Sequence, residues 1–374
     1  ILAPDFKPEM GGVAEYTYHL AHYLEQLNRL DRVITPVLQV QSYSFKVDSP
    51  AKNMLELTSH LKSKNVLLKK VHSLNYITQL KLLNLLLLKR LIGKYNNIFP
   101  IVTWIISPVA EQWFNLFHRF HIPYGVVFHG KDIIVANQKQ PELFAKICTK
   151  ANLLIFNSSA TEKLFQEVQP QIQKNSYILH PGIDINSLPP QSQLLSISQL
   201  EKHIGITIEG KLMISSVCRL VKRKGIDIAI KALEPLLKEN QNLVYLIAGD
   251  GEEFDVINNL IEQLKLSGQV KLLGNVSEVV KCSILNYSSI FLMPNHSDGG
   301  QDFEGFGISF IEASYFQNVV IGGCHGGVID AIKEGVNGFL VETESSSRIE
   351  DLRQVIAELL ANPEEIERIS KSAK

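Results

Sequence analysis

Short apolar runs alternate with amphipathic segments along residues 211–374. The runs KLMISSV, NLVYLIAG and SSIFLMP are apolar and contain β-branched residues, and each leads through a turn towards a segment with helical periodicity. We expect helices at about 225–238, 252–266, 308–316, 327–334 and 346–361. Such alternation is typical of a parallel sheet with helices on both faces. This half of the chain therefore predicts one doubly wound α/β domain.

The first half of the chain repeats this pattern less regularly. A helix is predicted from about 13 to 27, and strands at IVTWIIS, YGVVFHG and NLLIFNS precede a helix that opens near Ser159. Polar residues and a Pro-Pro pair at 186–208 indicate a linker. We therefore predict two Rossmann-like doubly wound domains, residues 1–185 and 209–374, facing each other across a cleft lined by the carboxyl ends of their strands.

Length and composition agree with two domains. The chain has 374 residues, 45% of them hydrophobic, which is more than one core usually organises. The first residues, ILAPDF, resemble the end of a strand rather than a signal peptide, and no charge-free run reaches the roughly 18 to 20 residues that a membrane span needs. Four widely spaced cysteines argue against a zinc ribbon, a redox motif or a disulfide framework: Cys148, Cys218, Cys282 and Cys324. We expect a cytoplasmic protein, soluble or peripheral to a membrane, with native residues beyond both ends of this chain.

Charge is unevenly distributed along the chain. Lys and Arg outnumber Asp and Glu in residues 1–185, whereas the acidic residues are in excess in residues 186–374. Within residues 60–94, lysines and one arginine alternate with many leucines. This pattern suits a basic amphipathic helix on the anionic inner face of a cell membrane. A helix packed against a sheet, with its lysines in water, explains the pattern as well.

Gly11 and Gly12 form the first candidate binding loop, between the initial strand and the first helix. Without side chains the backbone can approach a ligand closely, and the amides at the start of the helix favour an anion such as phosphate. A tight turn alone also explains two glycines.

A second candidate loop, SSVCRLVKRKG, follows a predicted strand and opens a helix. Arg219 and Lys224 lie where their charges could neutralise a diphosphate. Lys222 and Arg223 are expected to be solvated surface charges. An ordinary basic turn is the alternative interpretation of the whole loop.

The stretch EGFGISFIE places Glu304 and Glu312 around Gly305 and Gly307. The glycines allow close packing against a ligand, helix amides at about 306–308 would face an anion, and each carboxylate can bind a diol. A wholly helical segment would separate the glutamates by about 12 Å along its axis. Hydrolases with two carboxylates need roughly 5 to 9.5 Å. The spacing therefore favours two diols of one extended ligand, with surface glutamates as the alternative.

The histidines and the acidic residues give weaker evidence for a binding site. His129 ends a predicted strand, where it could hydrogen-bond a sugar hydroxyl or a phosphate oxygen, or be an ordinary packed polar residue. His19 and His22 lie three apart on a predicted helix but lack a third ligand nearby. Because the sequence contains no D-x-D motif for a divalent metal, basic side chains and helix amides would have to hold a diphosphate.

Seven segments of the chain occur in the order found in one enzyme family: GGVAEYTYHLAHYL, HPGID, VCRLVKRKG, LIAGDGEE, LLGNVS, EGFGISFIEAS and NGFLVE. In these segments the chain resembles the retaining, nucleotide-sugar-dependent glycosyltransferases of the GT-B fold, the large family called group 1 or family 4. The resemblance covers nearly the whole chain and is strongest after residue 180.

The resemblance implies roles for the residues of the stretch from Glu304 to Glu312, which we call the E-x7-E element. Glu304 would contact hydroxyls of the transferred sugar, and Glu312 would contact the ribose hydroxyls. The amides of Gly305, Phe306 and Gly307 would lie at the sugar and phosphate region.

The same resemblance implies the rest of the donor site. Arg219 and Lys224 would hold the diphosphate, and Gly12 would approach it from the other domain. His129 would lie by the sugar, and the segment around Val276 would lie beside the base. The N-terminal domain would bind the acceptor.

The activity implied is metal-independent, retaining transfer of a hexose from a UDP or GDP sugar. The acceptor would be a hydroxyl of a glycan or a lipid-linked molecule in cell-envelope or exopolysaccharide synthesis. No cofactor and no nucleic-acid partner are expected. The alternatives are a glycan phosphorylase or hydrolase on the same architecture, and a non-catalytic partner subunit that binds a sugar nucleotide.

Overall fold

The computed structural model confirms the α/β class, with two parallel sheets flanked by helices. Contacts divide the chain into two compact units, Ile1–Gly182 and Ile183–Lys374. Each unit is described by itself. The structure describes residues 1–2, 12–30, 33–34, 47–48, 98–106, 110–297, 299 and 302–373.

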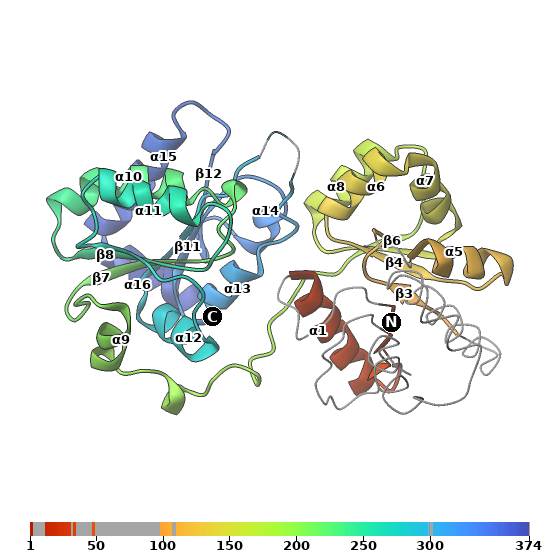
Figure 1. Ribbon diagram of the computed structural model, residues 1–374, viewed down its shortest axis with the longest axis horizontal. Coiled ribbons are helices and arrows are strands. Elements are labelled where there is room, and N and C mark those ends of the chain that lie inside the picture. Colours follow the sequence, from red (N-terminus) through yellow and green to blue (C-terminus); the bar gives the residue numbers. More distant parts are fainter. Residues whose placement is uncertain are drawn as a thin grey trace, which may run out of the picture. The chain divides into compact units, whose positions relative to one another are not determined.

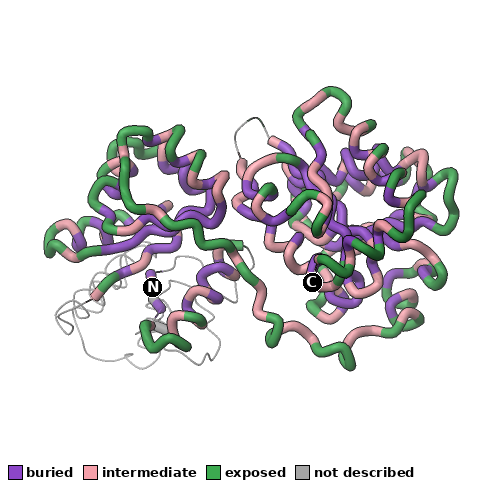
Figure 2. Tube along the Cα trace, turned by 180° about the vertical axis from the view of Figure 1, so that it is seen from behind, coloured by how far each residue is buried: buried purple, intermediate pink, exposed green. Residues whose placement is uncertain are grey.

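A six-stranded parallel sheet forms the centre of the second unit, in the order β12-β11-β10-β7-β8-β9. Its middle strands are apolar on both faces, as expected for a sheet covered by helices on each side. All six residues of β8 are buried, and Figure 2 shows this buried interior in purple. The strands are β7 (Leu212–Val217), β8 (Leu243–Ala248), β9 (Val270–Leu272), β10 (Ile290–Met293), β11 (Val319–Gly323) and β12 (Gly338–Val341).

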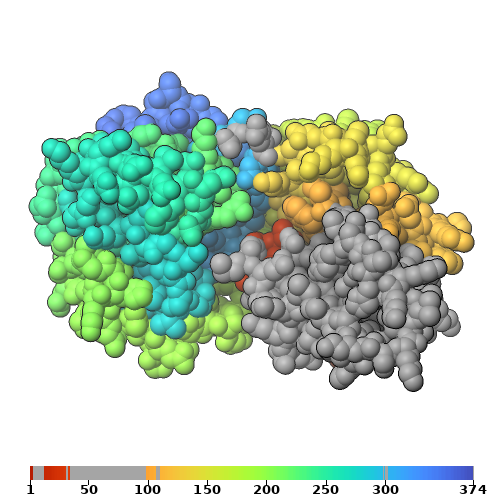
Figure 3. Space-filling view, in the orientation of Figure 1, coloured from red at the N-terminus to blue at the C-terminus, as the bar shows by residue number. Residues whose placement is uncertain are grey.

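Helices cover both faces of this sheet (Figure 1). The helices α10, α11 and α15 pack with Ile214 and Tyr245 in one apolar cluster. The helices α9 and α12 pack with Met213 and Val244, whose side chains point to the opposite face. In Figure 3, α9 to α12, coloured green to teal, form much of this unit's visible surface. The helices are α9 (Ile197–Ile204), α10 (Ile226–Glu239), α11 (Phe254–Gln263), α12 (Glu278–Tyr287), α13 (Ile308–Tyr315), α14 (Val328–Ala331), α15 (Arg348–Ala361) and α16 (Pro363–Ser372).

The first unit contains a four-stranded parallel sheet, β3-β4-β5-β6, and a separate parallel pair, β1-β2. Tyr16 of α1 packs with Val127 and Ile155, whose side chains lie on one face of the sheet. The strands are β1 (Val33–Ile34), β2 (Val47–Asp48), β3 (Ile101–Val102), β4 (Gly125–Phe128), β5 (Leu153–Phe156) and β6 (Ser176–Ile178). The described helices are α1 (Gly12–Gln26), α5 (Ala110–Arg119), α6 (Lys131–Lys139), α7 (Pro141–Lys150) and α8 (Ser159–Val168).

Most predicted elements are present near their expected positions. The helix expected near Ser159 begins there, because the Ser158 side chain accepts a hydrogen bond from the Thr161 amide and caps α8. The basic segment 60–94 and Gly11 lie outside the described residues. Within the part of the chain that the structure describes, no helix is long and apolar enough to cross a membrane.

The segment predicted as a linker, 186–208, is partly folded. It contains α9, which a Ser196 and Gln199 capping box begins and which Gly205 ends in the left-handed conformation. Leu200 and Ile204 of this helix pack into the core of the second unit. Leu200, Ile204 and Ile208 are therefore part of this unit's hydrophobic core.

Replacing Leu200 by Ala tests whether α9 stabilises the second unit. Leu200 has no exposed surface, so its truncation should lower the free energy of unfolding by about 2–5 kcal/mol. Urea denaturation measures this change, with the exposed neighbour Lys202→Ala as the matched control. An effect no larger than that of the control would contradict the packing of α9.

Candidate functional site

The loop between β7 and α10 places a basic side chain inside the protein. A short 3₁₀ helix, Lys222–Lys224, is followed by Gly225 at φ 68°. A Cβ at Gly225 would lie 2.2 Å from the carbonyl oxygen of Pro294, so only glycine allows this close approach. The amide of His296 donates to the Arg223 carbonyl at 2.9 Å. These contacts fix the loop against the end of β10.

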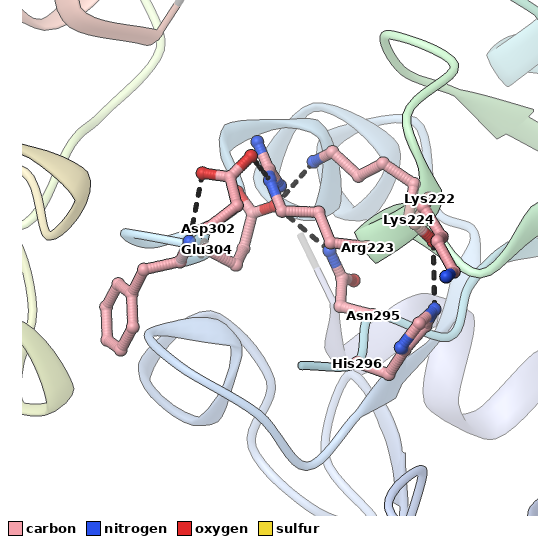
Figure 4. A network of polar contacts seen from close by, with 8 residues as sticks. Lys222, Arg223, Lys224, Asn295, His296, Asp302 and Glu304 are labelled. Carbon is pink, nitrogen blue, oxygen red and sulfur yellow. Dashed lines mark hydrogen bonds and ion pairs between the residues drawn. The ribbon is translucent and has the colours of Figure 1, made fainter. Parts of the chain in front are cut away.

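The carboxylate of Glu304 is the centre of a buried polar network (Figure 4). Its Oε2 accepts hydrogen bonds from Lys224 Nζ at 2.5 Å, from Asn295 Nδ2 at 3.0 Å and from the Arg223 guanidinium. Arg223 Nε also pairs with Asp302 Oδ2 at 2.8 Å. Side chains from the loops after β7 and β10 thus meet at one oxygen atom.

The network keeps Glu304 ionised although it is only 8% exposed. Burial raises the pKa of this carboxyl, but the charges of Lys224 and Arg223 lower it by more, so the net pKa lies below its ordinary value. Burial likewise lowers the pKa of Arg223, and the carboxylates of Glu304 and Asp302 raise it above its ordinary value. Both groups therefore carry their full charge at neutral pH.

Arg223 corrects the sequence interpretation, which placed it among solvated charges. Its guanidinium is largely buried and pairs with two carboxylates. Lys222, by contrast, is exposed as expected. A charge pattern could have indicated the pairing, because the adjacent basic pair Arg223 and Lys224 matches the acidic residues Asp302 and Glu304. Nothing in the sequence alone shows that the two segments meet.

The buried cluster of Arg223, Lys224, Asp302 and Glu304 carries two positive and two negative charges and is neutral as a whole. Arg219, at the end of β7, is exposed. No side chain in the described ranges is paired with it in an ion pair. An anionic ligand would therefore find an uncompensated positive charge at Arg219, in the same β7–α10 loop that contributes Arg223 and Lys224 to the neutral cluster.

The segment between the two glutamates is not one helix. Helix α13 begins only at Ile308, after Gly307 at φ 92°. Glu304 therefore lies in irregular backbone before the helix, and the separation predicted for a wholly helical segment does not apply. Phe306 is 4% exposed and belongs to the cluster around Phe310. It anchors the glycine-containing loop, and the first free amides of α13 follow immediately.

Glu312 lies on α13 and forms an ion pair that the sequence interpretation missed. Its Oε1 is 2.7 Å from Lys281 Nζ, which also lies 2.9 Å from Glu278 Oε1. Burial lowers the pKa of Lys281, but the Glu312 and Glu278 carboxylates raise it above its ordinary value. Lys281 therefore holds one oxygen of Glu312 in place. No sequence signal marks Lys281, because an isolated lysine on a helix is usually solvated.

His129 lies at the end of β4 in the first unit and is 8% exposed. Its Nε2 donates to the Thr103 carbonyl at 3.0 Å, and the Tyr16 ring meets the imidazole edge to face at 5.0 Å. Burial lowers the pKa of His129 to about 4, against the smaller opposite effect of the Thr103 hydrogen bond. The imidazole is therefore neutral at physiological pH, with its proton on Nε2 and a lone pair on Nδ1.

The remaining predicted residues lie at ends of elements. Gly12 is exposed at the first position of α1. Val276 is half-buried against the cluster that includes Val280, directly before the Ser277 cap of α12. Within the described residues, no group of three His, Cys, Asp or Glu side chains could hold a metal ion. The absence of a metal requirement stays a prediction.

The structure thus gathers the predicted residues into two sets. Lys224 and Glu304 are in direct contact in the second unit, and Glu312 lies on the helix that follows Glu304. His129 and Gly12 belong to the first unit.

Removing one cation tests whether the buried network stabilises the fold. Lys224→Met leaves the network with a net negative charge, and breaking a buried pair in this way should cost about 3–5 kcal/mol. Urea unfolding at neutral pH measures the loss, with exposed Lys222→Met as the control. Because the pKa of Glu304 is lowered, wild-type stability from this pair is complete above its ordinary value of 4.5 and is lost as the pH falls through the folded pKa. Equal stability of the two variants would contradict this assignment.

Comparison with known proteins shows what this chain is similar to. Residues 199–374 match the family model described as glycosyl transferases group 1. A GDP-mannose-dependent monoacylated alpha-(1-6)-phosphatidylinositol monomannoside mannosyltransferase of Corynebacterium glutamicum is 29% identical over 58% of this chain and 55% of that protein. The amylovoran biosynthesis glycosyltransferase AmsK of Erwinia amylovora is 30% identical over 34% of this chain and 32% of that protein. The match spans about half the length of the first relative and about a third of the second.

Solved structures share the fold over the whole chain. The Anabaena protein Alr3699/HepE, solved in complex with UDP, has a TM-score of 0.69 at 19% identity and covers 100% of this chain and 93% of its own. A glycosyltransferase from Rickettsia africae ESF-5 has a TM-score of 0.71 at 18% identity and covers 100% of this chain and 90% of its own. These similarities confirm the expected GT-B fold.

Proposed function

Because residues 199–374 match the group 1 glycosyltransferases, we propose that the chain is an enzyme of this family. It would transfer a hexose from a UDP or GDP sugar to a hydroxyl of a glycan or lipid-linked acceptor. The transfer would serve cell-envelope or exopolysaccharide synthesis and retain the anomeric configuration. The observation that carries this proposal is the buried Glu304 network, whose cations come from the same loop as the exposed Arg219. The names of relatives that use GDP-mannose or build polysaccharides agree with it.

Each end of the donor has a suitable partner in the second unit. Oε2 of Glu304 is fully engaged, whereas Oε1 has no partner among the described residues and can accept sugar hydroxyls. Glu312 Oε1 is paired with Lys281, which leaves Oε2 for the ribose hydroxyls. Arg219, Lys224 and the amides at the start of α13 would meet the diphosphate.

The chemistry follows from where charge develops. The acceptor oxygen attacks the anomeric carbon from the face that the nucleoside diphosphate leaves, and the bond from that carbon to the phosphate oxygen breaks. The leaving phosphate oxygen takes the acceptor proton, so the protein supplies no nucleophile and no metal. Arg219, Lys224 and the α13 amides stabilise the growing negative charge on the phosphate.

Location follows from the proposed acceptor. A lipid-linked acceptor would require contact with a membrane surface, and the basic residues 60–94 are our candidate for binding an anionic leaflet. That segment lies outside the described residues, so its support comes from the sequence alone. We propose a cytoplasmic enzyme that is peripheral at the inner face of the cell membrane.

Thermal stabilisation by nucleotides tests the donor site. With EDTA present, either UDP and its sugars or GDP and its sugars should raise the melting temperature. At a ligand concentration of 100 times Kd, binding should stabilise the folded protein by about 2.7 kcal/mol. Arg219→Ala and Glu312→Ala should abolish most of this shift, whereas exposed Lys222→Ala should keep it.

Incubating the protein with the stabilising sugar nucleotide and an acceptor then tests the stereochemistry of transfer. Product with the donor's anomeric configuration, identified by NMR, would support retaining transfer. An inverted product would contradict it. No stabilisation by any nucleotide, from a folded protein of native length, would contradict the proposed function and favour a phosphorylase or hydrolase.

A further inference from the structure

A buried carboxyl accepts a hydrogen bond from the backbone amide of His129. Asp132 is the second residue of α6 and has no exposed surface. Its Oδ1 accepts hydrogen bonds from the His129 amide at 3.0 Å and from the Ile133 amide at 3.1 Å. Between them, Gly130 adopts φ 102° and ψ −68°, a conformation that residues with a Cβ avoid. The turn that carries His129 is therefore closed by one carboxyl oxygen.

The second oxygen of this carboxyl is unusual. Asp132 Oδ2 is buried and has no hydrogen-bond partner among the described residues. An ionised carboxylate with an unsatisfied oxygen is costly inside a protein. Burial raises the pKa of Asp132 to about 7, although its backbone hydrogen bonds lower it. A proton on Oδ2 relieves the cost and leaves Oδ1 free to accept both amides.

His129 is held at two points by two different elements. Asp132 fixes its backbone from α6, and the Thr103 carbonyl after β3 fixes its ring. The rings of Tyr16 and Trp104 pack beside the imidazole at 5.0 and 6.3 Å. Nδ1 has no hydrogen-bond partner within the described ranges. Its lone pair is thus the imidazole's free acceptor for a ligand hydroxyl.

We propose that Asp132 is a positioning residue of the transfer reaction, which closes the His129–Gly130 turn and so presents the neutral imidazole, through Nδ1, to a hydroxyl of the donor sugar. The role at the sugar rests on the proposed function. The role in orienting His129 does not. Asp132 acts through His129 and does not itself touch the substrate.

The two groups also exchange a proton between the folded and unfolded states. Between about pH 4 and 6.5, the folded protein holds a proton on Asp132 and none on the second site of His129. In the unfolded chain, with ordinary pKa values of 3.8 and 6.5, the proton is on His129 instead. Each state binds one proton, so the pair itself gives little pH dependence of stability.

Other ionisable groups around the pair keep their charge state in this window. Cys148 on α7 stays a thiol, because burial and then the Asp132 charge raise its pKa, against the opposing charge of Lys174. Tyr16 on α1 stays neutral, because burial raises its pKa. Neither Cys148 nor Tyr16 therefore takes part in the proton exchange between Asp132 and His129.

Single substitutions should separate the two titrations. In His129→Gln only Asp132 remains, and its raised pKa should make stability fall as pH rises from 4 to about 7. In Asp132→Asn only His129 remains, and its lowered pKa should make stability fall as pH drops from 6.5 to about 4. Each slope should approach tenfold in the unfolding constant per pH unit relative to wild type. Curves parallel to wild type in both variants would overturn the exchange.

Orientation of the imidazole can be measured without any activity. Ring ¹⁵N NMR, with His129 assigned by its absence in His129→Gln, should show the neutral form with the proton on Nε2 in wild type. Asp132→Ala should give a mixture of both neutral forms, and Asp132→Asn, which keeps an acceptor at Oδ1, should restore the wild-type signal. An unchanged single form in Asp132→Ala would overturn the positioning role.

Transfer kinetics then test the step at the sugar. Asp132→Ala and His129→Ala should each lower kcat by about tenfold or more, and the double variant should be no worse than His129→Ala alone. Ser158→Ala, which removes the side-chain cap of α8, should lower the melting temperature and leave kcat unchanged. Multiplying losses in the double variant would overturn the proposal. If wild type transfers no sugar at all, the proposed function fails while the NMR result still decides the positioning role.

Discussion

The second unit depends on the neutralisation of one buried negative charge. Glu304 can leave water only because Lys224 and Arg223 compensate its carboxylate. The backbone around it is equally constrained, since a Cβ at Gly326 would lie 2.4 Å from the Glu304 carbonyl oxygen. The Gly327 amide donates to that same oxygen at 2.7 Å. Ion pairs and close backbone packing thus bring together the loops after β7, β10 and β11.

In Glu304 and Glu312, one carboxylate oxygen is held in place and the other is available to a ligand. One oxygen of each glutamate is engaged by a cation from another element, Lys224 for Glu304 and Lys281 for Glu312. The remaining oxygens are pre-oriented acceptors, because the paired side chains have already lost their rotamer freedom. A ligand with two diols would meet carboxylates whose ordering cost was met during folding.

Local sequence patterns predicted β7, β8, β10 and most of the second unit's helices, because buried runs such as β8 are apolar over their whole length. The strands β9, β11 and β12 were not predicted. The E-x7-E element was recognisable because its residues are neighbours in sequence. Contacts between distant segments were not, so Arg223 was assigned to solvent and Lys281 was overlooked. Residues 197–208 were assigned to a linker because a Pro-Pro pair and polar residues hid the short amphipathic helix α9.

Helix α1 has a further consequence for how the first unit is made. The Tyr16 hydroxyl donates to the Leu179 carbonyl at 3.2 Å, across 163 positions of the chain. The ring of Tyr16 also packs against β4 and β5. During synthesis these partners emerge from the ribosome long after the helix does. The first helix must therefore wait, with its apolar face exposed, until almost the whole unit has been translated.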